Sequence, residues 1–335
     1  MIPTKRDRSR RQIAAACVLA AATAAACASP GPDNHGRGPR NKPHAPAASE
    51  SPAPDVAAKG VPAAPDAHEG QGAQQAAPAY PSGQAKAVQE ATAREEALRA
   101  ARATAARAWG LTTPPLLAPA PPATKPALTG NGAHVIVRPG LPPVVRRVPT
   151  TDKVVFLTVD DGMEKDREFN RMLKELGIPV SAFVTDYLAR PNYGYFRDLR
   201  DQGASVHNHT LNHRDLRKLD YEGNRREVCG QQDNLEREIG VRPNLFRPPF
   251  GEYTEATLRA AASCGITAVP LWNQEAFPDR MEYRYGDHKF HPGDIILTHF
   301  RGPETWKGDM NAMLRLVVRE VTAQGFAIAR LEDYL

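Results

Sequence analysis

The large apolar side chains of this 335-residue chain lie almost entirely in its second half. All ten phenylalanines fall within Phe156–Phe326, and of the nine tyrosines and three tryptophans only Tyr80 and Trp109 precede residue 150. A sizeable core needs such side chains, so only about the last 180 residues can bury one, which is an ordinary length for a single domain. The sequence therefore predicts one globular domain over residues 151–335, preceded by a long segment without a core.

The first residues have the pattern of an export signal. A basic stretch is followed by the apolar run Ile13–Ala26, which has the length of a secretory signal and is too short and alanine-rich for a membrane-spanning helix. Two endings remain open. Ala24–Cys27 is similar to a bacterial lipobox, which would make Cys27 a lipidated N-terminus, whereas Ala26–Ala28 fits a signal-peptidase site. We predict an export signal over residues 1–27 and favour lipidation of Cys27.

Residues 28–150 are predicted to be a tether. Residues 28–84 are rich in Ala, Pro, Gly, Gln and Ser, and they cannot bury enough apolar surface to offset the chain entropy of folding. Residues 85–109 lack Gly and Pro and carry Glu–Arg pairs four residues apart, which favours a helix, although it has no apolar stripe with which to dock. Residues 113–127 are proline-rich again and are expected to be extended.

The charge distribution excludes a polyanionic partner. The net charge is +5, and five basic side chains against one aspartate within the first eleven residues supply +4 of it. The remainder has mixed signs and no basic stripe with interleaved aromatic residues. We therefore expect no binding to nucleic acid.

Two cysteines, Cys229 and Cys264, lie in the predicted domain. In an oxidising compartment an even number of cysteines suggests a disulfide, and two unrelated buried thiols are the alternative.

Short apolar runs alternate with amphipathic stretches beyond residue 153. The predicted strands are 154–159, 180–185, 204–207, 245–247, 266–271, 294–299 and 326–331. The predicted helices are 164–176, 195–202, 221–239, 254–264 and 309–324. The apolar runs do not alternate with polar residues, as expected for parallel strands covered on both faces. This order predicts an α/β fold, an incomplete or distorted (β/α) barrel of about seven parallel strands, although periodicity alone does not separate it from an open doubly wound sheet.

Polar side chains follow several of these strands, at the ends where parallel α/β folds gather functional residues. The first strand ends in Asp160-Asp161-Gly162. Adjacent carboxylates point in different directions, so one can bind a metal while the other faces a substrate. Taken alone, this sequence is also ordinary turn chemistry.

The third strand leads into a histidine-rich loop, His207–His213. His209 and His213 are four residues apart, a spacing that places two imidazoles on one side of a turn. With one carboxylate they would form a metal site of two histidines and one acid, which leaves coordination positions open. Two further strand ends carry Arg247–Gly251 and His299, which alone would be structural.

These features in this order resemble the polysaccharide deacetylase family, whose catalytic unit is the NodB-homology or carbohydrate esterase family 4 domain. The resemblance covers 153–335. It depends on Asp160-Asp161-Gly162, then Asn208-His209-Thr210-x-x-His213, then Arg247-Pro248-Pro249-Phe250-Gly251, then Leu297-x-His299. The family implies a NodB-like barrel and hydrolysis of acetyl groups on polysaccharides.

The resemblance also implies roles for individual residues. Asp161, His209 and His213 would bind a divalent metal, zinc foremost with cobalt as the alternative. Asp160 would be the general base, and His299 would protonate the leaving amine.

The pocket around these groups would come from the last two motifs and the segment between them. The backbone N–H of Phe250 would help to form the oxyanion hole, Arg247 would hold Asp160, and Leu297 would line the pocket for the acetyl methyl group, with Trp272 as a candidate wall.

The expected activity is N-deacetylation of peptidoglycan or a chitin-like polymer at the outer face of the cytoplasmic membrane, or in the wall after secretion. The expected partner is the polysaccharide. The protein would contact the membrane through the lipid anchor alone, and we expect it to be a monomer. Two alternatives remain: an O-acetyl esterase acting on xylan or wall polymer, and a carbohydrate-binding surface protein with impaired turnover.

One segment departs from the family pattern. The family has an Asp-x-x-Asp-Trp-like segment, in which one carboxylate adjusts the acidity of the histidine that acts as the general acid. This chain has Leu271–Asp279 at that place. Either Glu275 or Asp279 would replace that carboxylate, with Trp272 or Phe277 as pocket wall. His207 also departs, because glycine is common at its position in the family.

Overall fold

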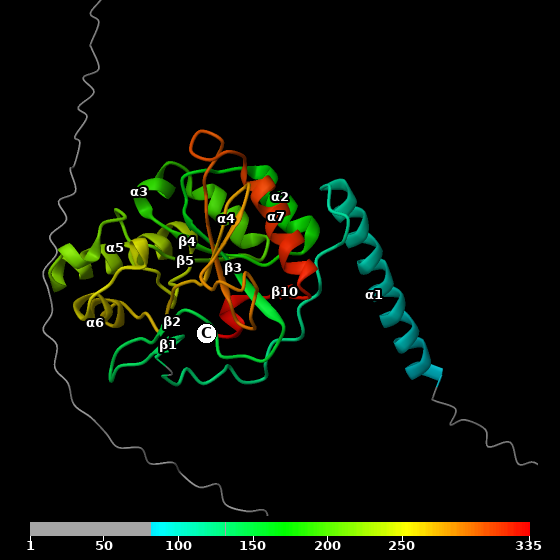
Figure 1. Cartoon of the computed structure of the whole chain (residues 1–335), viewed down its shortest axis with the longest axis horizontal. Coiled ribbons are helices and arrows are strands. Elements are labelled where there is room, and N and C mark those ends of the chain that lie inside the picture. Colours follow the sequence, from blue (N-terminus) through cyan, green and yellow to red (C-terminus); the bar gives the residue numbers. More distant parts are fainter. Residues whose placement is uncertain (1–81, 131) are drawn as a thin grey trace, which may run out of the picture. The chain divides into compact units, whose positions relative to one another are not determined.

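The computed structural model describes residues 82–130 and 132–335 (Figure 1). The predicted export signal, Cys27 and the tether residues 28–81 lie outside the described residues. Among the residues that are described, no helix combines the length and apolarity needed to cross a membrane.

A largely parallel sheet forms the centre of the domain. Its strands run in the order β5-β4-β3-β9-β7-β8, and β10 pairs with β3. Their bounds are β3 Val154–Asp161, β4 Ser181–Val184, β5 Ser205–Asn208, β7 Gln274–Ala276, β8 Met281–Tyr283, β9 Ile295–His299 and β10 Ala327–Ile328. Among the described strands of this sheet, only β8 runs antiparallel to its neighbour. All eight residues of β3 are buried, which agrees with the prediction of parallel strands covered on both faces.

The parallel arrangement continues beyond β5 without closing a barrel in the described part of the chain. The predicted strand at 245–247 is reduced to two isolated bridges, Phe246 with Asn208 and Leu245 with Ala268. Beyond them lies β6, Val269–Pro270. The α/β fold with a parallel sheet is therefore confirmed, and the barrel is incomplete, as predicted.

The helices lie around these strands (Figure 1). Their bounds are α2 Arg167–Leu176, α3 Asp186–Ala189, α4 Tyr193–Asp201, α5 Tyr221–Ile239, α6 Glu255–Ser263 and α7 Met310–Ala323. The caps explain several bounds. The side chain of Asp166 accepts a hydrogen bond from the N–H of Glu168 at the start of α2, and Gly177 ends the helix with a φ of 63°. The five helices predicted within the domain are all present.

The expected tether contains a packed segment, which corrects the predicted domain boundary at residue 151. The short strands β1 (Val135–Ile136) and β2 (Val144–Val145) form a second sheet with β6. Leu111 and Val148 are also buried. Aliphatic residues, rather than the aromatic residues on which the prediction relied, supply the apolar surface here. The compact unit consequently extends well before residue 151.

The predicted helix at 85–109 is present as α1, Ser82–Ala108. It was expected to have no docking surface, but its C-terminal end does contact the domain. Trp109 Nε1 donates a hydrogen bond of 2.7 Å to Glu175 of α2, and the Arg171 guanidinium lies 4.6 Å from the Trp109 ring. Ala106 is buried. An aromatic residue just after the helix, rather than an apolar stripe, provides this contact.

The two domain cysteines are joined by a disulfide, which settles the alternatives left open by the sequence. It links Cys229 of α5 to Cys264, the residue after α6. Cys264 belongs to a buried apolar cluster, and Cys229 packs against the same cluster.

His207, the third residue of β5, has a structural role, because its side chain contacts a carboxylate that also binds the starts of β4 and β5. Its Nε2 lies 2.6 Å from the Glu332 carboxylate, which also accepts hydrogen bonds from Ser181 and Ser205, the first residues of β4 and β5. The His207 ring packs on Phe183, with centroids 5.1 Å apart. Its departure from the family pattern is therefore absorbed by a buried polar network.

Candidate active site

Asp160 and Asp161 are the last two residues of β3, where alternation of the strand sends their side chains to different sides. Both are almost completely buried. Asp161 has a φ of 78°, a left-handed conformation that costs a non-glycine residue energy and that concentrates at functional sites. The chain thus leaves the sheet here in a strained turn that separates the two carboxylates.

His209 and His213 lie in the loop that follows β5. Thr210 and His213 have φ values of 73° and 51°, and the Thr210 hydroxyl accepts a hydrogen bond from the His213 N–H at 3.0 Å. The turn therefore brings the two rings together, with centroids 5.0 Å apart.

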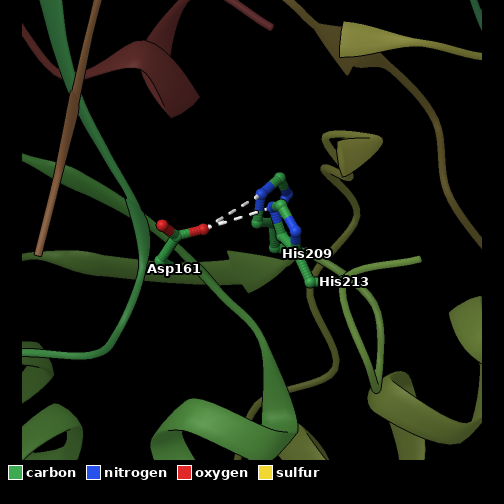
Figure 2. A group of neighbouring side chains, drawn as sticks. All are labelled: Asp161, His209 and His213. Carbon is green, nitrogen blue, oxygen red and sulfur yellow. Dashed lines mark ion pairs between the residues drawn. The ribbon is translucent and has the colours of Figure 1, made fainter. Parts of the chain in front are cut away.

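The three predicted metal ligands converge (Figure 2). Asp161 Oδ1 lies 3.3 Å from His213 Nε2 and 3.8 Å from His209 Nε2. One ligand atom from each residue lies within 4.8 Å of the others. A carboxylate oxygen and two imidazole nitrogens suit zinc and related divalent cations.

The protonation of the histidines fits such a cation. His209 Nδ1 faces the Arg247 carbonyl oxygen at 2.7 Å, so Nδ1 carries the proton and Nε2 presents a lone pair to the site. Burial lowers the pKa of His209 to about 4, and burial likewise lowers the pKa of His213. Both rings are therefore neutral at neutral pH, which is the form that binds metal.

The pKa of Asp161 is also suited to a ligand. Burial on its own would raise it, but the neighbouring His209, His299 and His213 together bring the pKa below its ordinary value. Asp161 is thus a carboxylate at neutral pH.

Arg247 holds the second carboxylate. It is fully buried, and its Nη1 donates hydrogen bonds to Asp160 Oδ1 at 2.7 Å and to the Thr158 hydroxyl at 2.8 Å. Its other nitrogens bind the carbonyl oxygens of Pro270 and Leu271. Burial raises the pKa of Asp160, and the Arg247 charge opposes this rise. The carboxylate is thus fixed in place, with a higher proton affinity than Asp161.

His299 ends β9 directly beside Asp160, its partner in the strand register. Burial lowers the pKa of His299. Of the two candidates for a carboxylate partner, Glu275 lies with its Oε1 3.7 Å from His299 Nδ1. Asp279 instead pairs with Arg280 on the surface. Burial, followed by the charge of Glu282, raises the pKa of Glu275 to about 7.

The remaining predicted pocket residues surround this group. Leu297 is buried two residues before His299 in β9, on the same face of the sheet. Phe250 is 60% exposed with a φ of 63°, and its ring lies 4.8 Å from that of His213. The Arg247 guanidinium lies 5.7 Å from the Trp272 ring.

The turn after Phe250 requires glycine because of Trp272. Gly251 has a φ of 69°, and a Cβ there would lie 2.8 Å from the Trp272 ring. Phe277, the alternative wall residue, packs instead on the Arg280 guanidinium, whose carbon lies 3.9 Å from the ring centroid.

One residue at the site was not predicted from the sequence. Arg301, two residues after His299, donates a hydrogen bond of 3.1 Å from Nη2 to Asp161 Oδ2. A single arginine in a loop gives no periodic or spacing signal, so only the position close behind His299 could have drawn attention to it.

The chain is similar in sequence to known proteins. The model of the polysaccharide deacetylase family matches residues 147–269, a segment that contains the first three motifs. A protein of Streptomyces coelicolor, SCO4760, is 47% identical over 196 residues, which cover 58% of this chain and 78% of that protein.

A characterised relative and a solved structure agree. The peptidoglycan-N-acetylmuramic acid deacetylase PdaA of Bacillus subtilis is 26% identical over 199 residues, covering 56% of this chain and 73% of that protein. The crystal structure of the peptidoglycan N-acetylglucosamine deacetylase Bc1960 superposes with a TM-score of 0.52 at 22% identity, covering 57% of this chain and 92% of that one, and so supports the fold. With its motifs converging at one end of the sheet, this chain belongs to the polysaccharide deacetylase family.

Proposed function

We propose that this protein is a metal-dependent hydrolase that removes acetyl groups from N-acetylated sugar polymers of the cell wall, peptidoglycan foremost. The observation that carries the proposal is the convergence of Asp161, His209 and His213 beside Asp160 and His299. The similarity to PdaA, a peptidoglycan-N-acetylmuramic acid deacetylase, supports the choice of polymer.

Asp160 would act as the general base. Its Oδ1 is occupied by Arg247, so Oδ2, which lies 3.7 Å from His209 Nε2, is the oxygen that faces the cluster. Oδ2 would accept the proton of the attacking water, while Arg247 keeps the carboxylate oriented. The raised pKa of Asp160 makes it a better proton acceptor than an ordinary aspartate.

His299 would act as the general acid. An amine leaves an amide only with a proton, and Nε2 of His299 would donate it while Nδ1 faces Glu275. Glu275 would stabilise the protonated ring and orient it. The Phe250 N–H would donate a hydrogen bond to the developing oxyanion, and Leu297 would line the space for the acetyl methyl group.

Asp161, His209 and His213 would hold the divalent cation, for which we propose zinc. When bound, the cation supplies polarisation of the acetyl oxygen and lowers the pKa of a water molecule towards about 7.

Acetate release tests the proposal. Purified protein reconstituted with zinc or cobalt is expected to release acetate from peptidoglycan or chitooligosaccharides, and a chelator should abolish the release. Absence of acetate from every N-acetylglucosamine polymer, with either metal present, would contradict the proposed function. Comparing acetate release from acetyl-xylan and from chitotetraose distinguishes an O-acetyl esterase from an N-deacetylase. Glycan binding without turnover, unchanged in Asp160→Asn, would support the carbohydrate-binding protein with impaired turnover.

The acid role has its own test, the His299→Ala variant. An activated acetate ester has a leaving group that needs no proton, so this variant should retain activity on the ester and lose nearly all of it on the amide. Equal losses on both substrates would withdraw the assignment.

We also propose that the protein is exported and acts as a monomer outside the cytoplasmic membrane, anchored through a lipid on Cys27. The signal-like residues 1–27 support this. Fractionation of cells that produce Cys27→Ser should find the protein in the medium. Membrane retention of this variant would rule out the lipid anchor.

A further inference from the structure

In each of the two adjacent carboxylates of the site, the two oxygens have different partners. Asp160 gives Oδ1 to Arg247 at 2.7 Å and turns Oδ2 towards His209. Asp161 gives Oδ2 to Arg301 at 3.1 Å and turns Oδ1 towards His209 and His213. Each aspartate thus has one oxygen bound by an arginine and one oxygen facing the histidines.

The backbone places Arg301 for this contact. Phe300, directly before it, is fully buried, and its N–H donates to the Asp160 carbonyl oxygen at 3.0 Å. The Phe300 ring packs against Phe169 and Phe196, with centroids 6.2 and 5.5 Å away. The loop after β9 is therefore fixed beside the end of β3, and the Arg301 side chain, 37% exposed, reaches back to Asp161 from the rim.

Asp161 needs such a partner if it is to be a well-ordered ligand. It lies outside regular strand geometry, with a φ of 78°, and a carboxylate free to rotate could present either oxygen. Carboxylates that bind metals are usually held by hydrogen bonds from supporting residues, and loss of such a residue typically costs about 10–100-fold in metal affinity or activity.

We propose that Arg301 is a positioning residue for the metal site: it binds Asp161 Oδ2 and thereby presents Oδ1 alone to the cation. The inference rests on the proposed metal site. The direction of the change in metal affinity separates positioning from charge. Removing the positive charge of Arg301 would by charge alone strengthen the binding of a metal ion, whereas loss of positioning weakens it.

Metal titration of the purified, metal-free protein tests this inference. Arg301→Met keeps the aliphatic length and removes the donors, Arg301→Lys keeps the charge and a donor, and Arg319→Met, on the exposed face of α7, is the matched control. Zinc and cobalt dissociation constants would be measured by calorimetry, and thermal melts of the metal-free proteins would verify the fold.

We expect Arg301→Met to bind metal about 10–100-fold more weakly, Arg301→Lys to recover part of this loss, and Arg319→Met to match the unchanged protein. Binding by Arg301→Met that equals or exceeds that of the unchanged protein would overturn the inference and leave the proposed function intact. If the unchanged protein binds neither metal, the proposed metal-dependent function fails, and the role of Arg301 fails with it.

Discussion

Two partly buried glutamates in different parts of the molecule have pKa values shifted in opposite directions. Glu332 lies against the starts of β4 and β5, and its pKa is lowered to about 2. Glu275 lies in β7 beside His299, and its pKa is raised to about 7. Burial on its own would raise the pKa of both groups. The difference must therefore come from their polar neighbours.

The neighbours of Glu332 satisfy its charge. Its carboxylate accepts hydrogen bonds from Ser181 and Ser205 and contacts His207. Glu275, in contrast, has the ring nitrogen of His299 at 3.7 Å, beyond hydrogen-bond distance, and the like charges of Glu282 and Asp160 raise its pKa further.

The difference separates groups that serve stability from groups available for chemistry. A satisfied buried carboxylate stabilises the fold, whereas a strained or partly satisfied one is a candidate for function. Asp160 belongs with Glu275 because its pKa is raised and one of its oxygens faces the histidine cluster.

The largest effect is expected from removing a metal ligand. His213→Ala takes away one of three donors, and three protein ligands leave little redundancy. Metal affinity should fall by more than the 10–100-fold typical of supporting residues, with near-complete loss of activity, as measured by calorimetry and acetate release. His288→Ala, in an exposed loop, is the control. Unchanged metal binding by His213→Ala would remove it from the site.

Asp160→Asn should separate chemistry from metal binding. An amide cannot accept the proton of water, so kcat/KM is expected to fall on the order of 10²–10⁴-fold while metal affinity stays close to that of the unchanged protein. Asp279→Asn, in a surface pair with Arg280, should change neither. Loss of metal by Asp160→Asn would make Asp160 a ligand and invalidate its role as base.

The fold was largely predictable where local signals agree with tertiary contacts. The bounds of α5 match the predicted range 221–239, and the local sequence explains why: the Asp220 side chain caps the start of the helix and Gly240 ends it. The packed segment before residue 151 was missed because β1 and β2 have two residues each, too few for periodicity. Their burial depends on pairing with β6, more than 100 residues away in the sequence.

The site was predictable where motifs follow parallel strands, because the carboxyl ends of such strands meet. This reasoning placed the Asp160-Asp161 pair beside the histidine loop, and the family resemblance then singled out Asp161, His209 and His213 as the ligands. The choice between Glu275 and Asp279 depended on the register of β7 against β9, which pairs Glu275 with Leu297. No sequence pattern specifies that register.

Acid sensitivity should be carried in part by Glu332. Its folded-state pKa of about 2 lies below the ordinary value of 4.5, so its contribution to stability is present above pH 4.5 and is lost as the pH falls towards 2. The shift corresponds to about 3 kcal/mol. In urea unfolding between pH 4.5 and 2.5, Glu332→Gln should lose correspondingly less stability than the unchanged protein. Glu255→Gln, on the exposed face of α6, should behave like the unchanged protein. Parallel pH profiles for Glu332→Gln and the unchanged protein would contradict the assignment.

Glu275 should show the opposite slope in the metal-free protein. Its folded-state pKa of about 7 lies above the ordinary value, so the unfolded chain releases the proton first, and folding stability falls as the pH rises from about 4.5 to 7. Glu275→Gln removes this cost and should be more stable than the unchanged protein at pH 8, by about 1 kcal/mol after allowing for solvent screening, and equal to it near pH 4. Urea unfolding at the two pH values measures the difference, with Glu255→Gln on the exposed face of α6 as control. The same variant should hydrolyse the amide substrate more slowly, because His299 loses the carboxylate that faces Nδ1. If Glu275→Gln gains stability and keeps full activity on the amide, then Glu275 destabilises the fold without having a role in catalysis.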